Sequence, residues 1–263
     1  MLMENILKIH EDSLYGSLDY KISEFILLNT FEMNEYSLGD IAKIVNLPKS
    51  SVASFFSNNR MSGGFPLFQR SLKTDLGRKT VTINLYLRQI RAFLNRVPKR
   101  MRVDLDGSYE RLSEEILKSR RVIFLGPKTL RESFIPLESL LWKKKIPCRY
   151  IVMSCACRYE KELSELGDED LVLMISPHDN YREFHYFLNS FPAVASAIGK
   201  CKGKILYLVA EYAGADENNC VTIIPAGVSL VDIPIAVHFA SFKLFYICAE
   251  RSGLDLSQQI CII

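Results

Sequence analysis

The chain has 263 residues, of which 48% are hydrophobic and 24% charged, and its formal net charge is +3. This composition excludes a disordered or fibrous protein, and the length allows one large domain or two ordinary ones. No apolar run approaches the roughly 18 residues of a membrane-spanning helix. Because the first residues also lack the pattern of a secretory signal, we expect a cytoplasmic protein without membrane contact.

The seven cysteines are odd in number and lie in the second half of the chain. In a reducing compartment such residues usually act as small buried hydrophobic side chains. The one tight pair, Cys155 and Cys157, lacks the second Cys or His pair of a zinc site. We therefore expect no metal and no cofactor.

Positive charge is concentrated in residues 41–103, where thirteen basic residues face one acid, Asp75. From Asp104 onward, eighteen basic residues face twenty-one acids. A local excess of this size repels itself unless a polyanion is near, and a phosphate backbone is the usual partner. A solvated basic face, or pairing with an acidic partner subunit, also explains the charge, so local architecture decides between them.

Two short helices separated by a turn are predicted within and just before this basic segment. A helix over Leu18–Phe31 precedes them. Ser37 can cap the first short helix, over Leu38–Val45. Asn46-Leu47-Pro48 predicts a turn, because proline has no amide hydrogen and disfavours helix in its predecessor. The second short helix is expected from Lys49 to Ser57.

The exposed face of this second helix is expected to be small and polar, as a DNA recognition helix requires. Small hydroxyl side chains let backbone amides approach phosphates and let side chains reach base edges. With the basic residues around it, this face predicts contacts to double-stranded DNA by Lys43, Lys49, Ser50, Ser51, Ser54, Asn58, Arg60 and Arg70. An ordinary helical hairpin with a polar face is the alternative.

This region resembles a known bacterial DNA-binding domain. The stretch SLGDIAKIVNLPKSSVASFF, followed by GGFPLFQRSL, is similar to the helix-turn-helix domain of the RpiR family of sugar-metabolism regulators. The family pattern is matched at Ser37, Ile41, Ala42, Val52, Phe55, Gly64, Phe65 and Phe68. Pro48, Ser54 and Gln69 stand where the family usually has Ser, Arg and a basic residue. The resemblance implies an all-α DNA-binding domain over residues 1–75 and a helical linker over 76–105.

The linker is predicted as one long helix from Thr74 to Arg102, with a break near Gly77 and an end at Pro98. Its apolar residues are too dense for a fully solvated rod. Part of it is therefore expected to pack against a second subunit, in a homodimer or a dimer of dimers.

From Arg121 onward, short apolar runs alternate with helical segments. Strands are predicted at Val122–Leu125, Cys148–Met153, Leu171–Ser176, Ile205–Val209 and Val221–Ile224, and helices near 109–119, 129–144, 182–200 and 232–252. This alternation indicates a parallel sheet covered on both faces. The chain is thus predicted to be α + α/β, with a three-layer sandwich and a five-stranded parallel sheet over residues 106–263.

Ligands of such sheets bind at the carboxyl ends of the strands. Two loops there carry the candidate effector-binding residues Gly126, Lys128, Thr129, Ser176, His178, Asn180 and Tyr181. A phosphate cradle needs glycines, hydroxyls and free amides at a helix N-terminus, and these loops hold part of that set. The order of elements resembles the SIS (sugar isomerase) domain that follows the helix-turn-helix in RpiR regulators and binds phosphosugars. Of its usual loops, G-x-G-x-S and S-x-S-G-x-T, Gly126 and Ser176 remain.

Three interpretations of this pocket are open. Lys128 and His178 bind a sugar phosphate by charge, or the pocket accepts another anion, or it binds no ligand and serves as a dimerisation scaffold. Asp179 places a negative charge where phosphate would sit, which favours the scaffold. We interpret His178 and His185 as surface residues rather than as a metal or acid-base site.

The sequence therefore favours a DNA-binding regulator of carbohydrate-metabolism genes whose SIS-like domain serves dimerisation and sugar-phosphate binding. The alternative class is a phosphosugar isomerase with an accessory domain, which would need a positioned base. Glu132, Glu138, His178 and His238 are present, but none lies in a recognisable catalytic pattern, so we assign no catalytic residue and expect no enzymatic activity. A third class is a structural module whose basic segment contacts an acidic protein.

Overall fold

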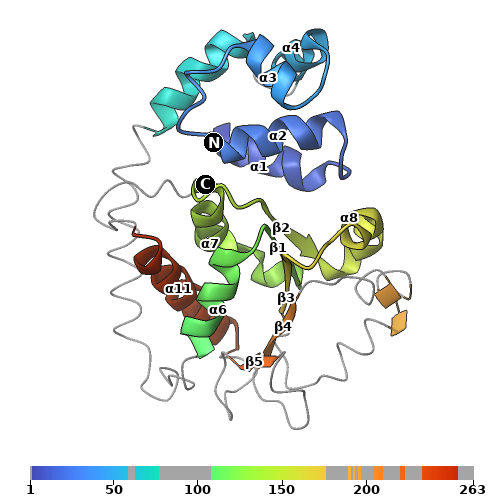
Figure 1. Cartoon of the computed structure of the whole chain (residues 1–263), viewed down its shortest axis with the longest axis vertical. Helices are drawn as coiled ribbons and strands as arrows, with labels where there is room; N and C mark the ends of the chain where they lie inside the picture. Colours follow the sequence, from blue (N-terminus) through green and yellow to red (C-terminus); the bar gives the residue numbers. More distant parts are fainter. Residues whose placement is uncertain are drawn as a thin grey trace.

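The computed structural model describes residues 2–58, 63–76, 108–175, 204–209, 220–222 and 233–253, with a few positions between 189 and 196. In this part of the chain, helices gather at one end of the molecule, above an α/β domain (Figure 1). We call the helical end, residues 2–58 and 63–76, the head. Nearly all of the predicted linker helix and much of the helix at 182–200 lie outside the described residues, so the predicted domain boundaries stay predictions.

The head is formed by α1, α2, α3 and α4, and by helical residues 64–76; the labelled helices span Leu2–Asp12, Leu18–Leu28, Leu38–Ile44 and Lys49–Asn58. The predicted ends of α3 and α4 are correct to within one residue. Helix α1 is an addition to the sequence prediction. It buries Met3, Ile6, Leu7 and His10, whose spacing of three and four residues puts them on one helical face.

Helix α2 ends three residues before the predicted end at Phe31. The side-chain amide of Asn29 donates to the carbonyl oxygen of Phe25 at 2.8 Å, and the Asn29 backbone N–H donates to the same oxygen at 3.0 Å. Asparagine side chains compete in this way for helical carbonyls and favour helix ends. Phe31 consequently lies outside the helix and is 44% exposed.

The α/β domain is built on a parallel sheet. Strands β1, β2, β3, β4 and β5 span Arg121–Gly126, Cys148–Val152, Asp170–Ile175, Lys204–Val209 and Cys220–Thr222, and they lie in the order β2-β1-β3-β4-β5. Strand β1 thus lies between β2 and β3. After β1 the chain forms β2 on one side of it and then crosses to form β3 on the other side. The predicted α/β fold with a parallel sheet is confirmed.

Both faces of the sheet are covered. On one face, Val122 and Phe124 of β1 share an apolar cluster with α6 (Ser108–Lys118), α7 (Arg131–Lys143) and α11 (Ile233–Arg251). On the other, Ile123 and Leu125 pack against side chains from η3 (Met153–Tyr159) and α8 (Glu160–Ser164). Successive residues of a strand point to opposite faces. A strand buried on both sides therefore reads as a continuous apolar run, as the sequence suggested.

The head is packed directly onto the α/β domain. Helix α2 lies against α7, α1 lies against β2, and the apolar core continues across the junction. The ring of His10 from α1 lies 5.2 Å from the ring of Trp142 from α7, and both side chains are 1% exposed. No pattern in the sequence predicts this junction.

Candidate nucleic-acid interface and ligand sites

The first helix of the predicted recognition motif, α3, is fixed by a capping box. The Ser37 hydroxyl accepts from the Asp40 N–H at 3.2 Å, and the Asp40 carboxylate accepts from the Ser37 N–H at 2.9 Å. Hydrogen bonds from the Ser37 side chain and backbone lower the pKa of Asp40. The turn that follows places Asn46 at φ 53°, a conformation that asparagine tolerates better than most residues. The chain is therefore held in a tight turn before α4.

Helix α4 has one buried and one exposed face. Val52, Phe55 and Phe56 are buried, and the Phe56 ring lies 4.9 Å from the rings of Phe65 and Phe68. Of the predicted DNA-contacting residues on this helix, Lys49, Ser50, Ser54 and Asn58 are exposed and Ser51 is half-buried. The hydroxyl-rich face is therefore not covered by any described part of the chain.

This exposed face borders a groove of about 450 Å³ between α4 and the start of α2. Ser50, Ser54 and Asn58 line it from α4, and Asp19 lines it from α2. Within the groove, the Asn58 side-chain amide donates to the Ser54 hydroxyl at 2.9 Å. Hydroxyl and amide groups can read base edges, while Asp19 adds a carboxylate that the sequence analysis did not select.

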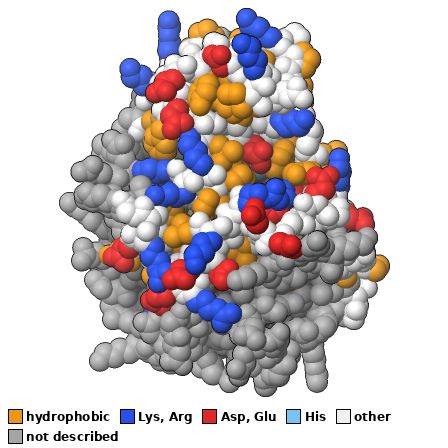
Figure 2. Space-filling model, viewed as in Figure 1, with side chains coloured by type: hydrophobic (Ala, Val, Ile, Leu, Met, Phe, Trp, Pro, Cys, Tyr) orange, Lys and Arg blue, Asp and Glu red, His pale blue; other side chains and the backbone are white. Residues whose placement is uncertain are grey.

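Exposed cations surround α4. Lys43, Lys49 and Arg70 are exposed as predicted, and so is Lys73, which the sequence analysis did not select. Figure 2 shows Lys and Arg side chains projecting from the head end of the molecule. Arg60 lies outside the described residues. The described cations lie on α3, on α4 and on the helix over residues 64–76, so they come from several elements of the head.

Gln69, which replaces the usual basic residue of the RpiR pattern, faces inward. Its side-chain amide donates to the carbonyl oxygens of Met33 at 2.9 Å and Tyr36 at 3.2 Å. These bonds tie residues 64–76 to the loop before α3. The role of Gln69 is therefore to hold the head together rather than to present a charge.

The carboxyl ends of β1 and β3 adjoin, since Leu125 pairs with Met174. A ligand site is expected at the carboxyl ends of two neighbouring parallel strands whose following connections run in opposite directions. Lys128 and Thr129 are exposed just after β1. The other four residues of the predicted effector set, Ser176, His178, Asn180 and Tyr181, lie outside the described residues.

The loop after β1 is closely packed. A Cβ atom on Gly126 would lie 2.6 Å from the Tyr150 hydroxyl oxygen and 3.0 Å from the Ile175 Cβ, so a larger residue would force these neighbours to shift. The Tyr150 hydroxyl donates to the Pro127 carbonyl oxygen at 2.8 Å, and the Leu130 N–H donates to the same oxygen at 3.1 Å. Tyr150 therefore fixes the loop from β2, a role the sequence does not reveal.

Two further polar side chains meet beside this loop. The Ser133 hydroxyl of α7 lies 2.5 Å from His238 Nδ1 of α11. Burial lowers the pKa of His238, and the charge of Glu132 opposes this shift. The pair is a hydrogen-bonded Ser–His arrangement without a described carboxylate bonded to the histidine.

A charged cluster that was not predicted from the sequence joins the head to the α/β domain. The Arg149 guanidinium of β2 forms a buried ion pair with Glu162 at 2.9 Å and donates to the carbonyl oxygens of Glu11 and Ser13 at 2.7 and 2.6 Å. It also lies 4.6 Å from the centre of the Tyr159 ring. A charged residue inside an otherwise apolar strand was the available signal.

The described residues include neither a cluster of metal-binding side chains nor a helix suited to span a membrane. They contain no group of three or more His, Cys, Asp or Glu side chains that could hold a metal ion. Among the described helices, none has the length and apolar character that crossing a bilayer demands.

No protein-family model and no curated protein matches the sequence. Among solved structures, NanR of Vibrio vulnificus complexed with ManNAc-6P is similar, with 12% identity and a TM-score of 0.42 over 96% of this chain and 93% of that one. The C-terminal domain of glucosamine-fructose-6-phosphate aminotransferase from Francisella tularensis gives 15% identity and a TM-score of 0.45 over 83% of this chain and 56% of that one. The sugar isomerase domain of an RpiR transcription factor from Sphaerobacter thermophilus gives 14% and 0.41 over 64% and 92%. All three TM-scores are below 0.5, and all three identities are below 25%.

Proposed function

We propose that this protein is a DNA-binding transcription regulator whose α4 enters the major groove. The observation that carries the proposal is the exposed face of Lys49, Ser50, Ser54 and Asn58, which follows a capped helix and a tight turn. The exposed cations around it suit the phosphate backbone, and the hydroxyl and amide groups suit base edges. The motif resemblance to RpiR regulators supports the same assignment.

The proposal extends to the rest of the chain. The α/β domain acts as a complete three-layer, five-stranded SIS-like unit that joins two copies of the chain, so that two heads meet successive major grooves. A sugar phosphate is its proposed effector at the loops after β1 and β3, and the genes it controls serve carbohydrate metabolism. Binding, not turnover, is the proposed activity.

The test is selection of duplexes from a random DNA pool, followed by fluorescence anisotropy with the enriched sequence. We expect a preferred sequence and weaker binding as salt rises. Lys49→Ala should weaken binding severalfold, whereas Lys118→Ala, which removes the same charge from a 76% exposed side chain on α6, should not. No enrichment, or equal loss in both variants, would remove the support for a recognition helix.

The Ser133–His238 pair favours a second candidate, a phosphosugar isomerase. A histidine of lowered pKa can serve as a base near neutral pH. Proton exchange at the carbon next to the carbonyl group of a sugar phosphate, lost in His238→Gln, would establish that activity and displace the regulator as the leading candidate.

A further inference from the structure

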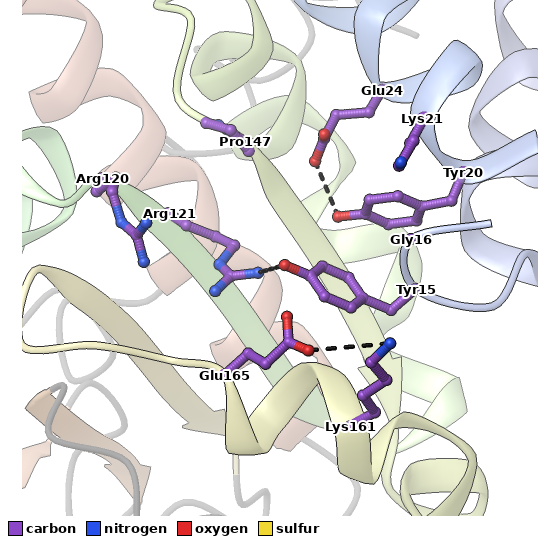
Figure 3. A pocket seen from close by; sticks show the side chains of 10 residues that line it. All are labelled: Tyr15, Gly16, Tyr20, Lys21, Glu24, Arg120, Arg121, Pro147, Lys161 and Glu165. Atoms are coloured by element: carbon purple, nitrogen blue, oxygen red, sulfur yellow. Dashed lines mark hydrogen bonds and ion pairs between the residues drawn. The ribbon is translucent and has the colours of Figure 1, made fainter. Parts of the chain in front are cut away.

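A cleft of about 490 Å³ lies where the head meets the α/β domain (Figure 3). Its head wall includes Tyr15, Lys21 and Glu24, and its other wall includes Arg120 and Lys161. It lies at the amino ends of the strands, because Arg121 begins β1 and also lines the cleft. The cleft is thus separate from the loops after β1 and β3, and its volume suits a small molecule.

Two arginines of the cleft are fixed by one carboxylate. Arg120 donates to Asp170 at 3.0 and 2.7 Å, and Arg121 donates to the same carboxylate at 3.1 Å. The Asp170 side chain is fully buried, whereas that of Arg120 is 57% exposed. Asp170 is thus shared by two guanidinium groups, and the negative charge of Glu169 also acts on Arg120.

Arg121 also reaches across to the head, as Figure 3 shows. It donates to the Tyr15 hydroxyl oxygen at 3.2 Å and lies 5.5 Å from the centre of the Tyr15 ring. The Tyr15 oxygen therefore acts as an acceptor toward Arg121, which leaves its own hydrogen to donate elsewhere. Arg121 is only 8% exposed, and this contact fixes the tyrosine at the cleft.

Of the side chains that line the cleft, four are cationic, Lys21, Arg120, Arg121 and Lys161, and two are carboxylates, Glu24 and Glu165. Lys21 forms no ion pair with any residue that the structure describes, and Lys161 is 4.0 Å from Glu165. Glu24 already accepts a hydrogen bond from the Tyr20 hydroxyl at 2.8 Å. The cleft therefore combines surplus positive charge with unused donors, and a ligand that fits it must bring acceptors and negative charge.

We propose that this cleft binds a small anionic metabolite through a phosphate or carboxylate group held by Lys21, Arg120, Lys161 and the Tyr15 hydroxyl. Such a ligand would touch the head and the α/β domain at once. If the proposed function holds, binding of this ligand changes the affinity of the head for DNA. Only this consequence rests on the proposed function.

Isothermal titration calorimetry of the full chain with inorganic phosphate, fructose 6-phosphate, 3-phosphoglycerate and citrate tests the proposal, with fructose as the neutral control. We expect at least one anion to bind and fructose not to bind. Comparison of the phosphate compounds with citrate shows whether the cleft binds a phosphate or a carboxylate group. Lys21→Ala and Arg120→Ala should each weaken binding about tenfold or more, because each removes a charged donor.

Lys118→Ala is the matched control and should bind as the unaltered protein does. Thermal melting identifies any variant that has lost its fold. Lys21 makes none of the hydrogen bonds to Asp170, so Lys21→Ala tests the site even where Arg120→Ala disturbs the fold. Lys128→Ala reports on the separate site proposed after β1. Loss of all binding in Lys128→Ala with full retention in both Lys21→Ala and Arg120→Ala would overturn the cleft proposal, as would failure of every anion to bind. DNA binding by the same samples is scored separately, so its absence would reject the regulator and leave the cleft site standing.

Discussion

The guanidinium of Arg149 lies 2.9 Å from the carboxylate of Glu162, and their side chains are 1% and 0% exposed. The same guanidinium donates to two carbonyl oxygens at the end of α1 and just beyond it. Arg149, on strand β2, is therefore paired with a carboxylate of α8 and hydrogen-bonded to carbonyl oxygens of the head. This side chain therefore links the two parts of the molecule.

Arg149→Met should destabilise the protein by about 3 to 5 kcal/mol, because it leaves Glu162 buried without its partner. The double variant Arg149→Met with Glu162→Leu should recover much of that loss, since no lone charge then remains buried. Equilibrium urea unfolding measures both values. Equal destabilisation in the single and double variants would show that the bonds to the head, and not the ion pair, dominate.

The pH dependence of stability should report a second junction contact. Arg131 bonds to Glu11 of α1 and lies 2.5 Å from Glu138, so two carboxylates share one guanidinium. Burial raises the pKa of Glu138 to about 7, against the charge of Arg131 and with a contribution from Glu11. The folded state therefore holds this proton more tightly than the unfolded state, and the free energy of unfolding should fall as pH rises from about 4.5 through 7, by about 3 kcal/mol at most.

Urea unfolding at pH 5, 6, 7 and 8 measures this fall. Glu138→Gln removes the titrating group and should remove most of the decline, whereas Glu160→Gln, at an exposed position on α8, should keep it. A decline of the same size in Glu138→Gln would assign it to another group, with Glu11 first in line because burial raises its pKa as well.

The parts of the fold that sequence predicts well are those with local causes. The cap at Ser37, the turn at Asn46 and the apolar runs of β1 and β3 each act within a few residues. The junction is different, because Arg149 finds Glu162 thirteen residues away but the Glu11 carbonyl 138 residues away. Which surfaces meet is decided by packing of the whole chain, and no local pattern records it.

The candidate sites divide in the same way. The exposed face of α4 follows from helical spacing once Val52 and Phe55 are placed in the core. The cleft does not, because Lys21 and Arg120 come from elements a hundred residues apart that meet only after the head has packed. Gln69 was interpretable only as a departure from a family pattern, and its inward hydrogen bonds depend on the loop before α3.

The glycine at the end of β1 gives a stability prediction. Gly126→Ala should cost about 1 to 3 kcal/mol, since its Cβ would lie 2.6 Å from the Tyr150 hydroxyl oxygen. Tyr150→Phe removes that oxygen, so the added cost of Gly126→Ala should be smaller in the Tyr150→Phe background. The four proteins form a double-mutant cycle, measured by urea unfolding. Strictly additive effects would mean that the backbone, and not the hydroxyl, limits the side chain at this position.

The last prediction separates backbone contacts from base contacts in the proposed DNA complex. Each lysine or arginine that neutralises a phosphate should contribute about 0.9 to the slope of log affinity against log salt concentration. Lys43→Ala, Lys49→Ala and Arg70→Ala should each lower that slope by about 1 and weaken all sequences alike. Ser54→Ala should leave the slope unchanged and instead reduce the preference for the selected sequence. Anisotropy titrations at four salt concentrations measure both quantities, and an unchanged slope in all three charge variants would place the phosphate contacts elsewhere on the chain.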